Sequence, residues 1–141
     1  MSRWGLEPVD PRELGAPRGY SNGMLGPTGG RILFVAGQVG WDGEQRLVGE
    51  GFVEQFERAL ANVVSVVRAA GGGPESLGRL TLYVTDREEY RRELVAVGEV
   101  YRRVMGRHYP AMALVEVAGL LEPGAKVEVE GTAVVPAGEE R

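Results

Sequence analysis

Residues 106–135 have the sequence GRHYPAMALVEVAGLLEPGAKVEVEGTAVV, and this stretch decides the fold. Two runs with strand character, 111–118 and 126–135, flank a loop in which Pro123 and Gly124 mark a turn. The pattern predicts a β-hairpin with a loop of medium length. The second run alternates polar and apolar residues, so its two faces are expected to differ. The first run is apolar on both faces, which is typical of a strand covered on both sides.

Three further segments have strand character, and they are residues 20–25, 31–39 and 79–85. The first two are joined by a Gly/Pro-rich turn and predict a second hairpin. Residues 45–48 are compatible with a short extra strand. Residues 1–19 contain three prolines and little periodicity, so we expect an irregular lead-in there.

Apolar residues recur at helical spacing over 52–70 and again over 90–104, which predicts two helices. Asp86, with Glu89 three residues later, is a capping signal for the second helix. Each helix has only one apolar stripe, so both are expected on the same face of a sheet. The element order therefore predicts an α+β fold with one mixed six-stranded sheet and two helices on one face.

The other face of this sheet is left without a cover from the same chain. Its candidate side chains, Tyr83 and the apolar residues of 111–118, are too apolar to form a large patch in water. We therefore expect other copies of the chain to cover this face.

Length and composition narrow the possible functions. A chain of 141 residues with a mass of 15.2 kDa predicts one domain over 1–141. It has no cysteine and one histidine, which excludes disulfides and a thiol nucleophile, and no metal site is expected. The net charge of −4 and the lack of a basic run argue against nucleic-acid binding. No signal peptide and no run of membrane-spanning length are visible, so a cytoplasmic location without membrane contact is expected.

Six short motifs, in order along about residues 19–136, resemble the RidA (YjgF) family. They are Gly19-Tyr20, Phe34-Val-Ala-Gly-Gln38, Ala59-Leu-Ala-Asn62, Leu80-Thr-Leu-Tyr-Val-Thr-Asp86, Tyr109-Pro-Ala111, and Val127-Glu-Val-Glu130 with Ala133-Val134. The resemblance implies a chorismate-mutase-like fold and a homotrimer with sheets around a central barrel. It also implies small-molecule pockets between subunits. Active members of the family hydrolyse enamines and imines, such as 2-aminoacrylate, to 2-keto acids and ammonia without a cofactor.

In the family pattern a glutamate positions water, a tyrosine closes the pocket and an arginine clamps the substrate carboxylate. The resemblance assigns the first role to Glu128 as the catalytic residue and the second to Tyr20, and it also matches Gly37. The arginine position is Met112, and its neighbour Ala113 stands where a serine is usual. Two further departures are Ala36 in place of serine and Gly98 in place of asparagine. Methionine at position 112 cannot donate the two parallel hydrogen bonds that an arginine forms with an α-carboxylate, so this forked partner is missing.

Each of these residues also has a structural interpretation. The strand pattern alone favours a solvent-facing role for Glu128, and the resemblance favours the catalytic role. Methionine fills gaps well, so Met112 is either interface core or part of a ligand pocket. Tyr20 is either a half-buried aromatic or the pocket tyrosine.

Three functions follow as hypotheses. The first is a trimeric imine or enamine hydrolase with an altered substrate, either less anionic or larger and more apolar, and with weak or no 2-aminoacrylate deaminase activity. The second is a non-catalytic ligand-binding or sensing trimer. The third, a ribonuclease or translation inhibitor, is disfavoured by the acidic charge balance.

Overall fold

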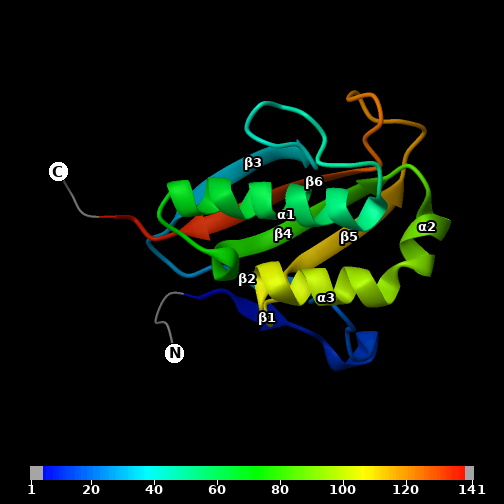
Figure 1. Ribbon diagram of the computed structural model, residues 1–141. Coiled ribbons are helices and arrows are strands. Elements are labelled where there is room, and N and C mark those ends of the chain that lie inside the picture. The colour runs from blue at the N-terminus through cyan, green and yellow to red at the C-terminus, as the bar shows by residue number, and fades with distance from the viewer. Residues whose placement is uncertain (1–4, 139–141) are drawn as a thin grey trace.

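The computed structural model describes residues 5–138 and shows a mixed α+β fold (Figure 1). The main sheet has four strands, which follow one another across the sheet as β3 (Arg31–Val39), β6 (Val127–Val135), β4 (Leu77–Val84) and β5 (Ala111–Glu116). β4 and β5 run parallel, whereas β6 is antiparallel to both β3 and β4. The predicted fold class, a mixed sheet with helices, is confirmed.

The two main helices, α1 (Phe52–Ala69) and α3 (Leu94–Met105), lie side by side on one face of this sheet (Figure 1). The predicted second helix is divided into α2 (Arg87–Arg92) and α3 at Glu93. The predicted cap is confirmed, because a carboxylate oxygen of Asp86 accepts hydrogen bonds from the N–H groups of Glu88 and Glu89. The division lets Tyr90 of α2 pack edge-on against Phe52 while α3 lies along α1.

The prediction that residues 111–135 form a hairpin is wrong, because β4 lies between β5 and β6. The connection over residues 117–126 is long enough to span the roughly 10 Å across an intervening strand, so it does not force adjacency. Two long-range contacts fix the start of β6 instead. The N–H of Lys126 donates to Oε1 of the buried Gln55 at 2.8 Å, and the N–H of Thr85 donates to the carbonyl of Lys126 at 3.2 Å.

The single six-stranded sheet is also corrected, because the remaining strands form a separate small sheet. It pairs β1 (Glu7–Val9) with β2 (Gly23–Leu25), and a 3-10 turn η1 (Arg12–Leu14) lies between them in the chain. Residues 5–19 are therefore less irregular than predicted, and the part of the prediction that concerns residues 1–4 lies outside the described residues. The predicted hairpin of 20–39 does not form because Ser21 bonds to the segment before β5: its N–H donates to the carbonyl of Pro110 and its hydroxyl to that of Tyr109. The predicted strand at 45–48 is reduced to one bridge, Trp41 to Leu47.

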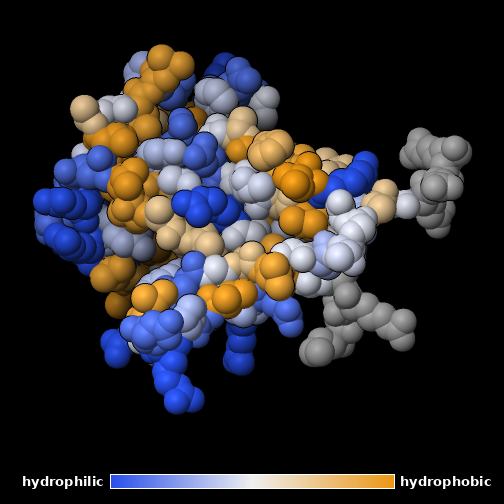
Figure 2. Space-filling model, turned by 180° about the vertical axis from the view of Figure 1, so that it is seen from behind, coloured by the Kyte–Doolittle hydropathy of each residue, from blue (hydrophilic) through white to orange (hydrophobic). Residues whose placement is uncertain are grey.

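The two faces of the main sheet differ in cover. Side chains of β6 alternate between buried and half-buried, and Val127 and Val129 are fully buried under the helices. On the helix-free face, Ile32 and Phe34 of β3 are 65% and 78% exposed. Figure 2 views the molecule from this side and shows apolar patches between polar side chains. Within residues 5–138 no helix has the length and apolar character needed to cross a membrane.

Candidate active site

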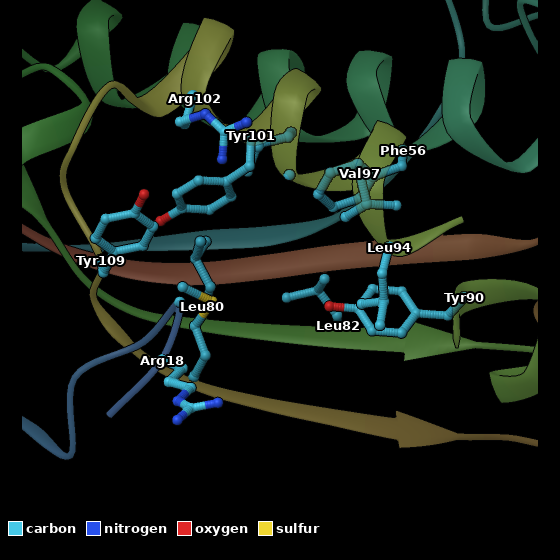
Figure 3. Close-up of a pocket in the computed structure, with 14 residues that line it drawn as sticks. Arg18, Phe56, Leu80, Leu82, Tyr90, Leu94, Val97, Tyr101, Arg102 and Tyr109 are labelled. Atoms are coloured by element: carbon cyan, nitrogen blue, oxygen red, sulfur yellow. The ribbon is translucent and has the colours of Figure 1, made fainter. Parts of the chain in front are cut away.

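An apolar pocket of about 340 Å³ opens between the helices and the β4–β5 edge of the sheet (Figure 3). This volume falls in the range of small-molecule sites, roughly 300–1,000 Å³. Side chains from α1, β4 and α3 form its apolar wall, and they are Phe56, Leu60, Leu80, Leu82, Leu94 and Val97. Most of the pocket therefore suits the apolar part of a ligand.

Two stacked tyrosines line one end of the pocket. The rings of Tyr101 and Tyr109 are nearly parallel, with centroids 5.3 Å apart. The Tyr101 hydroxyl donates to the carbonyl of His108 at 2.6 Å, and Nε2 of His108 bonds to the carbonyl of Leu77 at 2.6 Å. Burial raises the pKa of Tyr101, and the nearby Tyr109 adds to this effect. Tyr101 is therefore a neutral donor at neutral pH, and His108 fixes the loop before β5.

Four of the sequence-predicted ligand residues lie together at this edge of the sheet. Met112 and Gly98 line the apolar pocket. Tyr20 and Ala113 line a smaller adjoining cavity of about 190 Å³, which Met112 also lines. Tyr20 is held there by Ser21, which bridges to Ala111 of β5. The structure thus places Tyr20 next to β5, the strand that carries Met112.

Glu128 and Gly37 form a second cluster on the helix-free face. A Cβ atom added to Gly37 would lie 2.5 Å from Oε2 of Glu128, so no side chain fits there while the carboxylate keeps its position. The pairing of β3 with β6 shifts between Val35 and Gln38, and Gly37 lies within this shift. A glycine in a strand usually weakens it, and here it makes room for the carboxylate. Ala36, the neighbouring predicted site residue, is exposed on β3.

The two glutamates of the Glu-x-Glu pair differ in their partners. The Tyr83 hydroxyl donates to a carboxylate oxygen of Glu130 at 2.5 Å, and this bond is the main reason that the pKa of Tyr83 is raised. Among the described residues, the side chain of Glu128 has neither a hydrogen bond nor an ion pair, although Glu128 lies opposite Tyr83 in the strand register. Of the two carboxylates, Glu128 is therefore the one available to bind a ligand or a water molecule.

One chain does not bring the predicted site together. Met112 packs against the helix-covered core, whereas Glu128 projects from the opposite face of the sheet. Both clusters reach the surface. A second copy of the chain could therefore add residues to the Glu128 cluster by packing on the helix-free face, or to the Met112 cluster by packing at the β5 edge. The described residues contain no group of three or more His, Asp or Glu side chains placed to hold a metal ion.

Comparison with known proteins identifies the chain. Residues 11–135 match the family described as Endoribonuclease L-PSP. The protein belongs to this family, which includes the RidA (YjgF) proteins. Among sequence relatives, the 2-iminobutanoate/2-iminopropanoate deaminase of Capra hircus is 32% identical over 105 residues, which cover 74% of this chain and 73% of the relative.

Solved structures agree with this assignment to the RidA family. The crystal structure of YyfB, a Rid-family protein of unknown function from Yersinia pestis, is 29% identical and superposes with a TM-score of 0.82, covering 93% of this chain and 99% of its own. Escherichia coli TdcF with bound serine is 26% identical with a TM-score of 0.63, covering 84% and 95% of the two chains. The fold is therefore that of the RidA family.

Two residues of this RidA-family pocket were missed by sequence reasoning. Arg18 and Arg102 both line the apolar pocket, and Arg18 also lines the adjoining cavity. The available signals were local: Arg18 directly precedes the Gly19-Tyr20 motif, and Arg102 lies four residues after Gly98 and so on the same side of a helix. Neither spacing distinguishes a pocket residue from a solvated arginine without the tertiary structure.

Proposed function

We propose that the protein is a cofactor-independent hydrolase of imines, with Glu128 as the residue that directs water. The observation that carries the proposal is the carboxylate of Glu128, which packs on Gly37 and has no partner among the described residues. Relatives named 2-iminobutanoate/2-iminopropanoate deaminase support imine chemistry at the level of the family.

The reaction needs only water and a group that moves a proton. The water oxygen adds to the imine carbon, the π electrons of the C=N bond move to nitrogen, and nitrogen takes up a proton from solvent. Glu128 accepts the proton that the attacking water loses. The hydroxyl of the adduct then loses its proton to solvent, the carbonyl forms and the C–N bond breaks. Glu128 returns its proton to the departing nitrogen, so one imine and one water give one carbonyl compound and one ammonia.

The proposed site assembles between copies of the chain in a homotrimer. The support is the uncovered sheet face, on which Ile32 and Phe34 are mostly exposed although both are large and apolar. Packing of this face against another copy would cover these side chains. It would also bring a neighbouring surface over Glu128, which one chain leaves open.

The proposed substrate differs from the small 2-imino acids. Met112 stands at the arginine position of the family pattern, and it lines an apolar pocket. Methionine offers no forked partner to a carboxylate at this position, and a small substrate would leave most of the apolar wall of the pocket uncovered. We therefore expect weak or no activity on the imine derived from 2-aminoacrylate.

The test is ammonia release from imines that an L-amino-acid oxidase generates in situ, measured above the uncatalysed rate. Glu128→Gln keeps the size of the side chain and removes the proton acceptor, so it is expected to abolish the acceleration. Glu130→Gln is the matched control, because Glu130 is bonded to Tyr83. Full activity of Glu128→Gln, or a loss of activity only in the Glu130 variant, contradicts the assignment of Glu128.

The second candidate is a ligand-binding or sensing trimer without turnover. The absence of an arginine at Met112 favours it, because this departure removes a group that the family pattern uses on the substrate. A thermal-shift panel with the corresponding keto acids separates the two functions: stabilisation without any accelerated ammonia release supports the binding protein. A salt-titrated RNA-binding assay tests the disfavoured ribonuclease function.

A further inference from the structure

The apolar pocket has two cationic groups at its rim. Arg18 and Arg102 line it, and within residues 5–138 neither forms an ion pair. By contrast, Arg103, the next residue on α3, is paired with Glu57. Two unpaired guanidinium groups beside an apolar pocket favour an anionic ligand group at that place.

The Arg102 side chain packs beside Gly98. A Cβ atom at Gly98 would lie 3.4 Å from Nη1 of Arg102, so the guanidinium lies directly over the glycine. Figure 3 shows the Arg102 side chain beside Tyr101, with its guanidinium turned toward the pocket. A charged group one helical turn away from Gly98 therefore lines the pocket beside this departure from the family pattern.

Arg18 reaches the same region from the loop before β2. It precedes Gly19, whose φ of 74° is a left-handed conformation that suits glycine. Arg18 and Met112 line both the apolar pocket and the adjoining cavity, so the cation lies beside the position where the family pattern has an arginine. A positive charge thus lies near this position although the strand residue is methionine.

The remaining lining residues indicate what the rest of the ligand is like. In Figure 3 both arginines lie toward the end where Tyr101 and Tyr109 stack, and Tyr90 and Leu94 lie toward the opposite end. The Tyr101 hydroxyl is already bonded to the carbonyl of His108. A ligand that satisfies both ends has an anionic head and a bulky apolar body.

We propose that this pocket binds 2-imino and 2-keto acids with large apolar side chains, and that Arg18 and Arg102 hold their carboxylate in place of the missing strand arginine. This inference rests on the proposed function only where it concerns the hydrolysis of imines. The binding of keto acids does not depend on that function. It also decides between the two substrate types left open by the sequence: the ligand is larger and more apolar, and it remains anionic.

Three probes separate the two ends of the pocket. Phenylpyruvate has both the ring and the carboxylate, phenylacetone has the ring and ketone without the carboxylate, and pyruvate has the carboxylate without the ring. Calorimetry is expected to show that the wild type binds phenylpyruvate at least about tenfold more tightly than either of the others. Raising the salt concentration is expected to weaken only the binding of the two acids.

Arg18→Gln and Arg102→Gln remove one charge each. Each is expected to weaken phenylpyruvate binding by about fivefold, as suits a partly exposed charge-assisted contact, and to leave phenylacetone binding unchanged. Arg92→Gln, an exposed arginine outside the pocket lining, is the control with the same change in charge. Equal binding of phenylpyruvate and phenylacetone by the wild type, or phenylpyruvate affinities of both pocket variants equal to that of the control, would overturn the inference.

The reaction assay separates this inference from the proposed function. The imine of phenylpyruvate is generated in situ from phenylalanine by an L-amino-acid oxidase. Carboxylate-dependent binding without accelerated ammonia release upholds the inference and contradicts the hydrolase. Accelerated release that is the same in both arginine variants and the wild type upholds the hydrolase and contradicts the inference.

Discussion

The two faces of the sheet are built by the same strands but have different surroundings. In β6, Val127 and Val129 are fully buried under α1. The alternate residues of the same strand, among them Glu128, stay half-buried on the face that no helix covers. On that face Phe34 is 78% exposed. The comparison shows that one chain completes only one of its two apolar layers, and that the candidate catalytic carboxylate belongs to the incomplete one.

The largest expected effect is on the covered face. Val129→Asp would place a carboxylate in a fully buried position without a partner, which is expected to lower the free energy of unfolding by roughly 4 kcal/mol or more. Urea unfolding followed by circular dichroism measures this change. A variant that unfolds at the wild-type urea concentration would show that the helix-covered layer is not the main core.

A charge on the helix-free face is expected to affect assembly instead of folding. Phe34→Asp should leave the helical signal of the single chain unchanged, because the side chain is mostly exposed there. Light scattering should give about three times 15.2 kDa for the wild type and a smaller species for the variant. A wild-type monomer at micromolar concentration would contradict the trimer and the shared site.

Gly37→Ala tests the link between the incomplete face and the chemistry. The added methyl group would lie 2.5 Å from a carboxylate oxygen of Glu128, so the carboxylate must move. Because misplaced catalytic groups lose much of their effect, we expect imine hydrolysis to fall by about tenfold or more. Gly119→Ala, where the added atom meets nothing within 4 Å, is the control. Unchanged activity in Gly37→Ala would separate Glu128 from the reaction.

Met112→Arg tests the pocket on the covered side. An arginine there would add a further, forked partner for a small carboxylate, so pyruvate is expected to bind several-fold more tightly than to the wild type. Calorimetry measures the change, and Met112→Leu is the control for altered volume. If the arginine variant binds pyruvate no better than the leucine variant, the carboxylate position of this pocket lies elsewhere.

The smallest expected effect concerns Tyr101 at the end of that pocket. Tyr101→Phe removes the bond to the carbonyl of His108 and is expected to cost about 1 kcal/mol near pH 7. Because burial raises the pKa of Tyr101 in the folded chain, its contribution is complete below about pH 10 and decreases as the pH rises above that value. The stability difference between wild type and variant should therefore shrink in alkali. A difference that stays constant up to pH 11.5 contradicts the buried, neutral tyrosine.

Local signals in the sequence were enough to locate the main helices and most strands of the main sheet. Apolar stripes located α1 and α3, Asp86 marked the start of α2, and alternation located β4 and β6. The resemblance of short motifs to the RidA family also pointed to Met112, Gly98, Tyr20 and Ala113, which line two adjoining cavities in the structure. These features depend on neighbours within a few residues, where spacing alone carries the information.

Strand order and the cations of the pocket were decided only by the tertiary structure. The turn at 123–124 is local, yet the ten-residue connection allows β4 to enter between β5 and β6, and the long-range bond from Lys126 to Gln55 fixes where β6 begins. Arg18 and Arg102 are 84 positions apart and look like ordinary surface arginines in the sequence. They meet at one pocket because the segment before β2 bonds to the residues preceding β5, and α3 packs over the same edge. Sequence spacing carries no information on such contacts.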